Sequence, residues 1–204
     1  RPADPMAEHP WSGLPCFPLL VPDFIAESER TQALGFLTAH AADFGATDPA
    51  AYWAGRTLTL PQVRDPAIRV LLRDLQRRII ARVEAALEEH LGPQPTLYAD
   101  VINFARWPPG YELLPHADAE NPGGEPHPYP WRHFASVIYL NDDYGDGAIH
   151  FPELDIELRP PVRTLLVFPG TLDYLHGVRP VTHGMRHTLA SFLTFDAAHD
   201  AGAT

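Results

Sequence analysis

Three residues in the C-terminal half carry metal-binding side chains at spacings that could bring them to one ion. His116 and Asp118 are separated by a single residue, and His176 follows after a long interval. On a strand, residues two apart project to the same face, so His116 and Asp118 are predicted to aim at one point. A second histidine from another strand would complete a facial set of two imidazoles and one carboxylate. That set leaves adjacent coordination positions open, which suits Fe(II), whereas zinc more often takes a closed tetrahedral set or three ligands and one water.

The order of these residues carries more weight than any one of them. A histidine and an aspartate two apart occur often by chance, and a single histidine usually makes ordinary hydrogen bonds. Here the pair follows a turn at Gly110, His176 ends an apolar segment, and Arg186 comes ten residues later at the start of the next segment. Packing alone does not explain that order. The other histidines of this half have no ligand spacing and are expected to lie around the site or on the surface: His127, His133, His150, His183 and His187.

The elements that would position these residues change character along the chain. Apolar residues at helical spacing predict a first helix over 28–40. A second helix is predicted between Asp65-Pro66, which supplies an N-cap and a first-turn proline, and Gly92-Pro93, which ends it. Beyond Pro95 the pattern is one of short segments with strand composition and turn residues between them, at 97–106, 134–140, 148–151, 156–158, 164–168, 175–178 and 188–195.

Helices followed by many short strands predict an α+β fold with a curled antiparallel sandwich, whose helices cover one outer face. No composition break separates two cores, so the 204 residues are expected to form a single domain. Within it we expect an extended proline-rich arm over 1–22, a helical support over 23–95 and the β-rich core over 96–196.

Composition narrows the possible partners. All fifteen basic residues are Arg, and twenty-six acidic residues bring the net charge to −11, which gives no general attraction for nucleic acid or anionic lipid. No apolar run approaches the length of a membrane span. The single Cys16 excludes an intrachain disulfide framework. With no leader sequence, the expectation is a cytoplasmic protein that binds neither nucleic acid nor membranes, although the start at Arg1 could reflect trimming.

Several motifs in the β-rich half fit one known family. They are Phe134–Tyr144 (FASVIYLNDDY), Leu165–Gly170 (LLVFPG), Leu175–Thr182 (LHGVRPVT) and Arg186–Thr188 (RHT). Together with His116-Ala-Asp118 they resemble the iron(II)- and 2-oxoglutarate-dependent oxygenases of the prolyl hydroxylase superfamily. The likeness spans roughly 97–196. Within that superfamily the chain is most similar to the catalytic domains of the prolyl 3-hydroxylase (leprecan-like) type.

The resemblance implies a double-stranded β-helix, a cupin-like jelly-roll barrel, with N-terminal supporting helices. His116, Asp118 and His176 match the family's iron ligands. Arg186 matches the basic residue that pairs with the distal carboxylate of 2-oxoglutarate, and a guanidinium offers that carboxylate a planar fork. Thr188 is two residues further on the same strand face and could add a hydroxyl. The family's tyrosine before the metal motif is absent, and Asn103, Tyr98 or Tyr139 could supply a replacement polar contact.

The activity that the resemblance implies is oxidative. An Fe(II)- and 2-oxoglutarate-dependent dioxygenase would use O2 to hydroxylate an unactivated C–H bond and release succinate and CO2, with ascorbate as a possible support. The substrate would be a prolyl residue, a free amino acid or a small biosynthetic intermediate. The proline-rich segment 119–131 follows two ligands directly, so it is predicted to act as a substrate lid with Tyr129 and Trp131 facing the substrate.

Two other classes of function remain open at this point. One is a cupin-type metal enzyme that isomerises or hydrolyses without oxidation, which would have no use for an arginine ten residues past His176. The other is a non-catalytic jelly-roll binding module, which would usually have lost a ligand. The sequence does not indicate an oligomeric state.

Overall fold

The computed structural model describes residues 9–48 and 50–203. Its two α-helices are α1 (Glu27–Ala39) and α2 (Pro66–Leu91). The strands are β1 (Leu19–Val21), β2 (Thr57–Thr59), β3 (Tyr98–Trp107), β4 (Leu113–His116), β5 (Phe134–Tyr139), β6 (Gly145–Asp146), β7 (Ile149–Phe151), β8 (Ile156–Leu158), β9 (Leu165–Pro169), β10 (His176–Val178), β11 (Val181–His183) and β12 (Arg186–Thr194). Short 3-10 helices lie at Ala41–Phe44, Leu60–Gln62, Pro152–Leu154, Leu172–Tyr174, Ala197–His199 and Ala201–Ala203.

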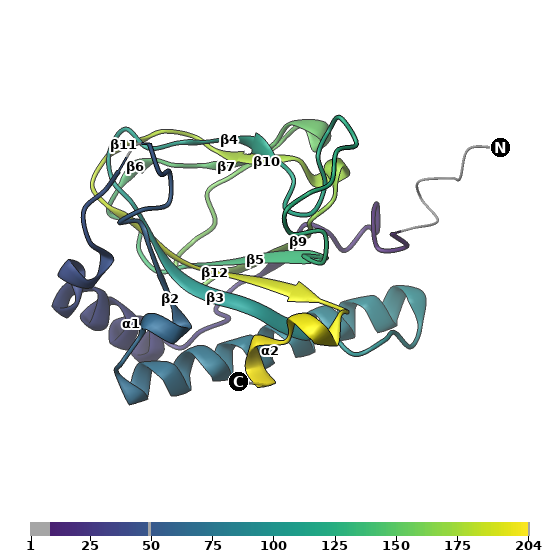
Figure 1. Ribbon diagram of the computed structural model, residues 1–204, viewed down its shortest axis with the longest axis horizontal. Coiled ribbons are helices and arrows are strands. Elements are labelled where there is room, and N and C mark those ends of the chain that lie inside the picture. The colour runs from purple at the N-terminus through teal and green to yellow at the C-terminus, as the bar shows by residue number, and fades with distance from the viewer. Residues whose placement is uncertain (1–8, 49, 204) are drawn as a thin grey trace.

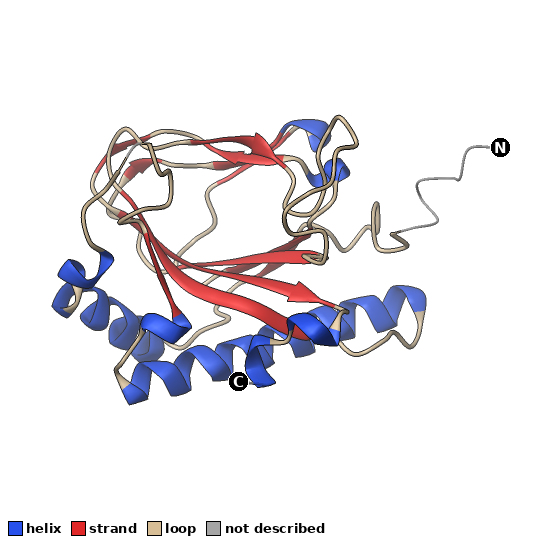
Figure 2. Ribbon diagram, in the orientation of Figure 1, coloured by secondary structure: helices blue, strands red, loops and turns tan. Residues whose placement is uncertain are grey.

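The strands form two main antiparallel sheets that face each other (Figure 1). The larger has the order β1-β9-β5-β12-β3-β2, and the smaller has the order β4-β10-β7-β8. A two-stranded ribbon joins β11 to β6. Both helices cover the outer face of the larger sheet, and the smaller sheet lies on its opposite side (Figure 2). This arrangement is a jelly-roll, a double-stranded β-helix, with supporting helices, as predicted.

The helices form where local signals place them. The carboxylate of Asp65 accepts hydrogen bonds from the backbone N–H groups of Ala67 and Ile68, so it caps the free donors at the start of α2. Gly92, in the left-handed region with φ 73°, follows the last residue of the helix. The apolar residues of α2 recur every three or four positions and are buried against the sheet, and they are Ile68, Leu71, Leu72, Leu75, Ile79, Val83 and Leu87.

Alternation along the central strands divides the core from the interior of the barrel. Phe104 of β3 and Leu189 of β12 pair with each other and point to the helices, where Phe104 packs against Phe36 of α1 at 5.4 Å between ring centroids. The neighbouring positions Asn103 and Thr188 point the other way, into a cavity between the two sheets. The period of two thus gives each strand one structural face and one face toward the site.

The structure differs from the predicted organisation at short strands. Residues 19–21, predicted to be part of an extended arm, form β1 and pair with β9, and residues 57–59, predicted within the helical support, form β2 and pair with β3. Both are three-residue edge strands, whose formation depends on the exposed edge of a distant partner rather than on local pattern. Residues 1–8 of the arm lie outside the described part of the chain. Among the described residues, neither helix is both long and apolar enough to cross a membrane.

Candidate metal centre and cosubstrate pocket

His116, Asp118 and His176 come together at one end of the smaller sheet. His116 is the last residue of β4, His176 is the first residue of β10, and the two are paired directly across these antiparallel strands. One donor atom from each of the three residues lies within 4.8 Å of the other two. Strand pairing over a long sequence interval therefore produces the convergence that the sequence predicted for this triad.

Asp118 lies on a turn, and not on the strand that the sequence predicted to carry it together with His116. Strand β4 ends at His116, so Asp118 is on the following turn. Its backbone N–H donates to the carbonyl of Gly170 at 3.1 Å, and the N–H of Ala119 donates to the same oxygen at 2.9 Å. A Cβ on Gly170 would lie 2.2 Å from the carbonyl oxygen of Arg132 and 3.4 Å from the Cβ of Asp118. The turn is thus held against the end of β9 at a point where only glycine fits.

Both imidazoles are oriented by backbone carbonyls. Nδ1 of His116 lies 3.0 Å from the carbonyl oxygen of Leu114, and Nδ1 of His176 lies 3.1 Å from that of Tyr174. A carbonyl can only accept, so each Nδ1 carries the proton and each Nε2 is left as the donor atom for a metal. Each Nε2 lies 3.6 Å from an oxygen of Asp118. The ring tautomers are therefore set for metal binding through Nε2.

Burial and mutual charge determine the protonation of the cluster. Burial lowers the pKa of His176 to about 4, so this ring is neutral at physiological pH. Burial also lowers the pKa of His116, but the hydrogen bond and charge of Asp118 outweigh it and raise the net value above the usual one. Burial raises the pKa of Asp118, but the two histidines outweigh that effect and keep it ionised. The cluster offers one anionic oxygen and two imidazole nitrogens.

This donor set fits an iron site. Two histidines and one carboxylate are the donor set of non-haem Fe(II) oxygenases, and all three side chains line a cavity of about 440 Å³. Oδ2 of Asp118 is buried without a hydrogen-bond partner among the described residues. A buried carboxylate oxygen in that state needs a cation, and a bound metal would supply it.

Arg186 lines the same cavity, and no carboxylate of the described residues forms an ion pair with it. Its side chain is 2% exposed, and Nε and Nη1 have no hydrogen-bond partner among the described residues. The guanidinium lies 5.0 Å from the ring centroid of Trp107 and 5.3 Å from that of Tyr139. Burial raises the pKa of Tyr139 to about 12, so its unpartnered hydroxyl remains a donor. A buried cation beside a neutral hydroxyl, with both unsatisfied, fits a ligand carboxylate.

Of four other residues predicted to contact cosubstrate or substrate, three line the cavity and one does not. Thr188 and Asn103 are buried and line the cavity, and Nδ2 of Asn103 also donates to the carbonyl of Phe104 at 3.3 Å. Tyr129 lines the mouth and is 43% exposed. Trp131 does not line the cavity. Its ring stacks on His199 at 3.6 Å between centroids.

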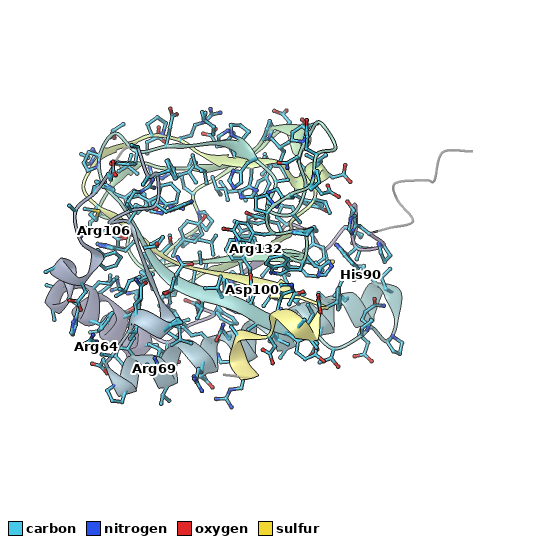
Figure 3. All side chains as sticks on the ribbon, in the orientation of Figure 1. Arg64, Arg69, His90, Asp100, Arg106 and Arg132 are labelled. Atoms are coloured by element: carbon cyan, nitrogen blue, oxygen red, sulfur yellow. The ribbon has the colours of Figure 1, made fainter. Side chains whose placement is uncertain are left out.

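Arg132 is a cavity residue that the sequence analysis did not single out as one. It forms an ion pair with Asp100 at 3.0 Å, and the two residues lie beside each other in Figure 3. Its guanidinium lies 3.9 Å from the ring centroids of both Tyr129 and Phe192. These contacts fix the end of segment 119–132 to the larger sheet. The sequence feature that could have indicated Arg132 as a cavity residue is its position immediately after an aromatic-rich loop.

Fold and site together define a jelly-roll protein with a two-histidine, one-carboxylate metal centre. Residues 102–194 match the family model of the 2OG-Fe(II) oxygenase superfamily, and this stretch includes all three ligands and Arg186. Over this stretch the chain is therefore similar to the 2OG-Fe(II) oxygenase superfamily. The iron(II) and 2-oxoglutarate that this family is named for fit the three-ligand cluster and Arg186.

Individual relatives of this chain match different shares of it. Over 80 residues it is 35% identical to prolyl 3-hydroxylase 1 of Gallus gallus, which is 37% of this chain but only 11% of that protein. Among solved structures it is similar to the viral collagen prolyl hydroxylase of Paramecium Bursaria Chlorella virus-1 in complex with 2OG, with a TM-score of 0.63, 14% identity and coverage of 86% of this chain and 93% of that one. It is also similar to the Trichoplax adhaerens prolyl hydroxylase bound to a hypoxia inducible factor peptide, with a TM-score of 0.64, 16% identity and coverage of 91% and 86%. At 14% and 16% sequence identity, the similarity to these solved structures supports the fold of this chain alone.

Proposed function

We propose that this chain is a dioxygenase that hydroxylates an unactivated C–H bond of a prolyl residue in a peptide or protein. In the balanced reaction, substrate C–H, O2 and 2-oxoglutarate give substrate C–OH, succinate and CO2. One oxygen atom enters the product and the other enters succinate. The observation that carries the proposal is that Arg186, a buried and unsatisfied guanidinium, lines the same cavity as the His116, Asp118 and His176 cluster.

Each part of the site has a task in this reaction. His116, Asp118 and His176 would hold iron, which when bound activates O2 for oxidation coupled to the decarboxylation of 2-oxoglutarate. Arg186 would bind the distal carboxylate of that cosubstrate, with Thr188 at the same strand face. The apolar side chains between the two sheets limit the access of water to the centre.

Two features support a peptidyl substrate. Over 77 to 80 residues the chain is 31–35% identical to several prolyl 3-hydroxylases. The cavity mouth also carries Tyr129, a half-exposed aromatic ring of the kind on which an apolar prolyl ring can stack. A free amino acid or other small molecule is the competing substrate class. A non-oxidative cupin-type activity is disfavoured because it gives Arg186 no ligand.

The test is a coupled assay of succinate formation with a panel of substrates. The panel contains a Pro-Pro-Gly repeat peptide, an oligoproline peptide, a peptide of equal length without proline, and free L-proline. We expect the two proline peptides to stimulate turnover and to gain 16 Da by mass spectrometry, with the proline-free peptide inactive. Stimulation by free L-proline alone would replace the peptidyl substrate with a metabolite. No turnover of 2-oxoglutarate under any condition would contradict the activity itself.

A further inference from the structure

A second buried arginine lies outside the catalytic cluster. Arg56 directly precedes β2 and is 0% exposed. Nη1 donates to the carbonyl of Tyr52 at 3.2 Å, whereas Nε and Nη2 have no hydrogen-bond partner among the described residues. No carboxylate forms an ion pair with it within the described ranges. A guanidinium buried in this way is costly unless something other than an anion stabilises it.

Four aromatic rings take the place of the missing anion. The guanidinium carbon lies 4.3 Å from the ring centroid of Tyr52, 4.9 Å from Trp53, 4.4 Å from Trp107 and 4.4 Å from Tyr111. Each distance is within the range of a cation–π contact, and such contacts are strongest when they are desolvated. Arg56 therefore joins three segments that are separate in sequence: the turn before β2, the end of β3 and the turn before β4.

One of these rings is at the mouth of the cavity. Trp53 lines the cavity and is 43% exposed, unlike Trp107, which is buried. The Trp53 indole meets Trp107 edge to face at 5.6 Å and meets Tyr52 edge to face at 4.8 Å. The hydroxyl of Tyr52 in turn donates to the carbonyl of Glu112. An exposed indole is thus held from several sides rather than left to rotate.

The turn that carries Trp53 is also fixed in its backbone. The N–H of Arg56 donates to the carbonyl of Trp53 at 3.0 Å, and the side chain of Arg106 donates to the carbonyl of Gly55 at 2.7 Å. Gly55 has φ +70°, and a Cβ there would lie 2.3 Å from the carbonyl oxygen of Ala46. The tight turn places Trp53 and the buried Arg56 three residues apart on one compact support.

We propose that Trp53 contacts the substrate at the cavity mouth and that Arg56 is the positioning residue that holds its indole there. The inference rests on the proposed function and specifies one wall of the substrate site. An apolar prolyl ring or a neighbouring peptide segment would pack on Trp53 at the mouth that Tyr129 also lines. Apolar packing alone could fill the space behind Trp53, but a cation favours ring faces and therefore also fixes the orientation of the rings.

The experiment compares matched variants with the most active peptide of the panel above. Trp53→Ala removes the ring, Trp53→Leu keeps bulk without an aromatic face, and Trp53→Phe keeps an aromatic face. Arg56→Met removes the charge and Arg56→Lys keeps it. Arg77→Met, an exposed site on α2 that pairs with Asp74, is the control for loss of an arginine. Peptide affinity is also measured by calorimetry on Zn(II)-loaded protein with 2-oxoglutarate, so that binding is read without turnover.

For Trp53→Ala we expect peptide KM and Kd to rise about tenfold, equivalent to about 1.4 kcal/mol, with the KM for 2-oxoglutarate and kcat at saturating peptide within about twofold. Trp53→Phe should recover most of the affinity and Trp53→Leu little of it. Arg56→Met should weaken peptide binding in the same direction, with Arg56→Lys in between. If Arg56→Met does not fold, the comparison of Arg56→Lys with wild type decides its role.

Three results would overturn the inference. Peptide KM and Kd unchanged in Trp53→Ala would remove Trp53 from the substrate site. A rise in the KM for 2-oxoglutarate, rather than for peptide, in the Arg56 variants would assign Arg56 to Trp107 and the cosubstrate pocket. If no peptide stimulates the wild type, the peptidyl substrate and this inference both fail. Peptide-independent decarboxylation of 2-oxoglutarate in that case would show that the oxygenase activity itself stands.

Discussion

Replacing Arg186 by methionine should separate cosubstrate binding from stability. The side chain is 2% exposed and two of its N–H donors have no partner among the described residues, so the ligand-free protein gains little from the charge. Substitution by an apolar side chain of similar length is therefore expected to leave the melting temperature unchanged or higher. Most point mutations of a buried residue lower it, which makes this expectation distinctive.

The magnitude for the cosubstrate follows from the same two donors. A hydrogen bond to a charged group contributes about 1.5–3 kcal/mol, so loss of two would cost about 3–6 kcal/mol. At about 1.4 kcal/mol for each tenfold change, the Kd for 2-oxoglutarate should rise by roughly 10² to 10⁴. Calorimetry on Zn(II)-loaded protein measures this Kd, and metal affinity should be unchanged because Arg186 is not a ligand.

Arg179→Met is the matched control, because Arg179 is half exposed and pairs with Glu157 at 2.9 Å away from the cavity lining. It should leave the Kd for 2-oxoglutarate within about twofold of wild type. A melting temperature several degrees lower in Arg186→Met, together with an unchanged Kd, would refute the reasoning. Arg186 would then support the fold rather than bind the cosubstrate.

Three further perturbations test the turn that carries Asp118, the N-terminal cap of α2 and the protonation of His176. Gly170→Ala should displace the turn that carries Asp118 and weaken metal binding at least tenfold by calorimetry, since the added Cβ meets backbone; unchanged metal affinity would show that the turn is not held there. Asp65→Ala should lower the free energy of unfolding by about 1 kcal/mol in urea through loss of the α2 cap, and a urea midpoint unchanged from wild type would contradict it. Because His176 has a pKa of about 4 in the fold and about 6.5 when unfolded, its contribution to the stability of the metal-free protein should be complete above pH 6.5 and fall by about 3 kcal/mol toward pH 4. His176→Leu should reduce the loss of stability over this range, and an equal loss in both proteins would exclude His176 as its source.

The parts of the fold that local signals specify could be predicted from the sequence. The cap at Asp65 and the glycine at 92 bound α2, and the apolar repeat between them gives the buried face. The seven predicted strand segments each overlap a strand of the structure because their composition and flanking turns are local features. The short strands β1 and β2 escaped prediction because three residues carry too little pattern, and only the edges of β9 and β3 make them strands.

The site likewise has features that local sequence predicts and features that only long-range packing determines. The three ligand positions could be proposed from residue type and spacing, but the contact that holds Asp118 is to Gly170, far along the chain. Trp131 was predicted to face the substrate because it lies in the loop after the ligands, yet its ring stacks on His199 near the C-terminus. Arg56 carried no signal at all, since the four rings around it come from separate segments. Long-range packing decides such contacts, and one sequence does not show it.

The central claim is that His116, Asp118, His176 and Arg186 form one centre for iron and 2-oxoglutarate. Anaerobic titration of the metal-free protein with Fe(II) and then with 2-oxoglutarate, followed by visible absorption, tests it most directly. The account predicts a charge-transfer band only when both are present, absent in His176→Ala and requiring far more 2-oxoglutarate in Arg186→Met. Iron binding with no spectral response to 2-oxoglutarate, or an unchanged band in His176→Ala, would contradict it.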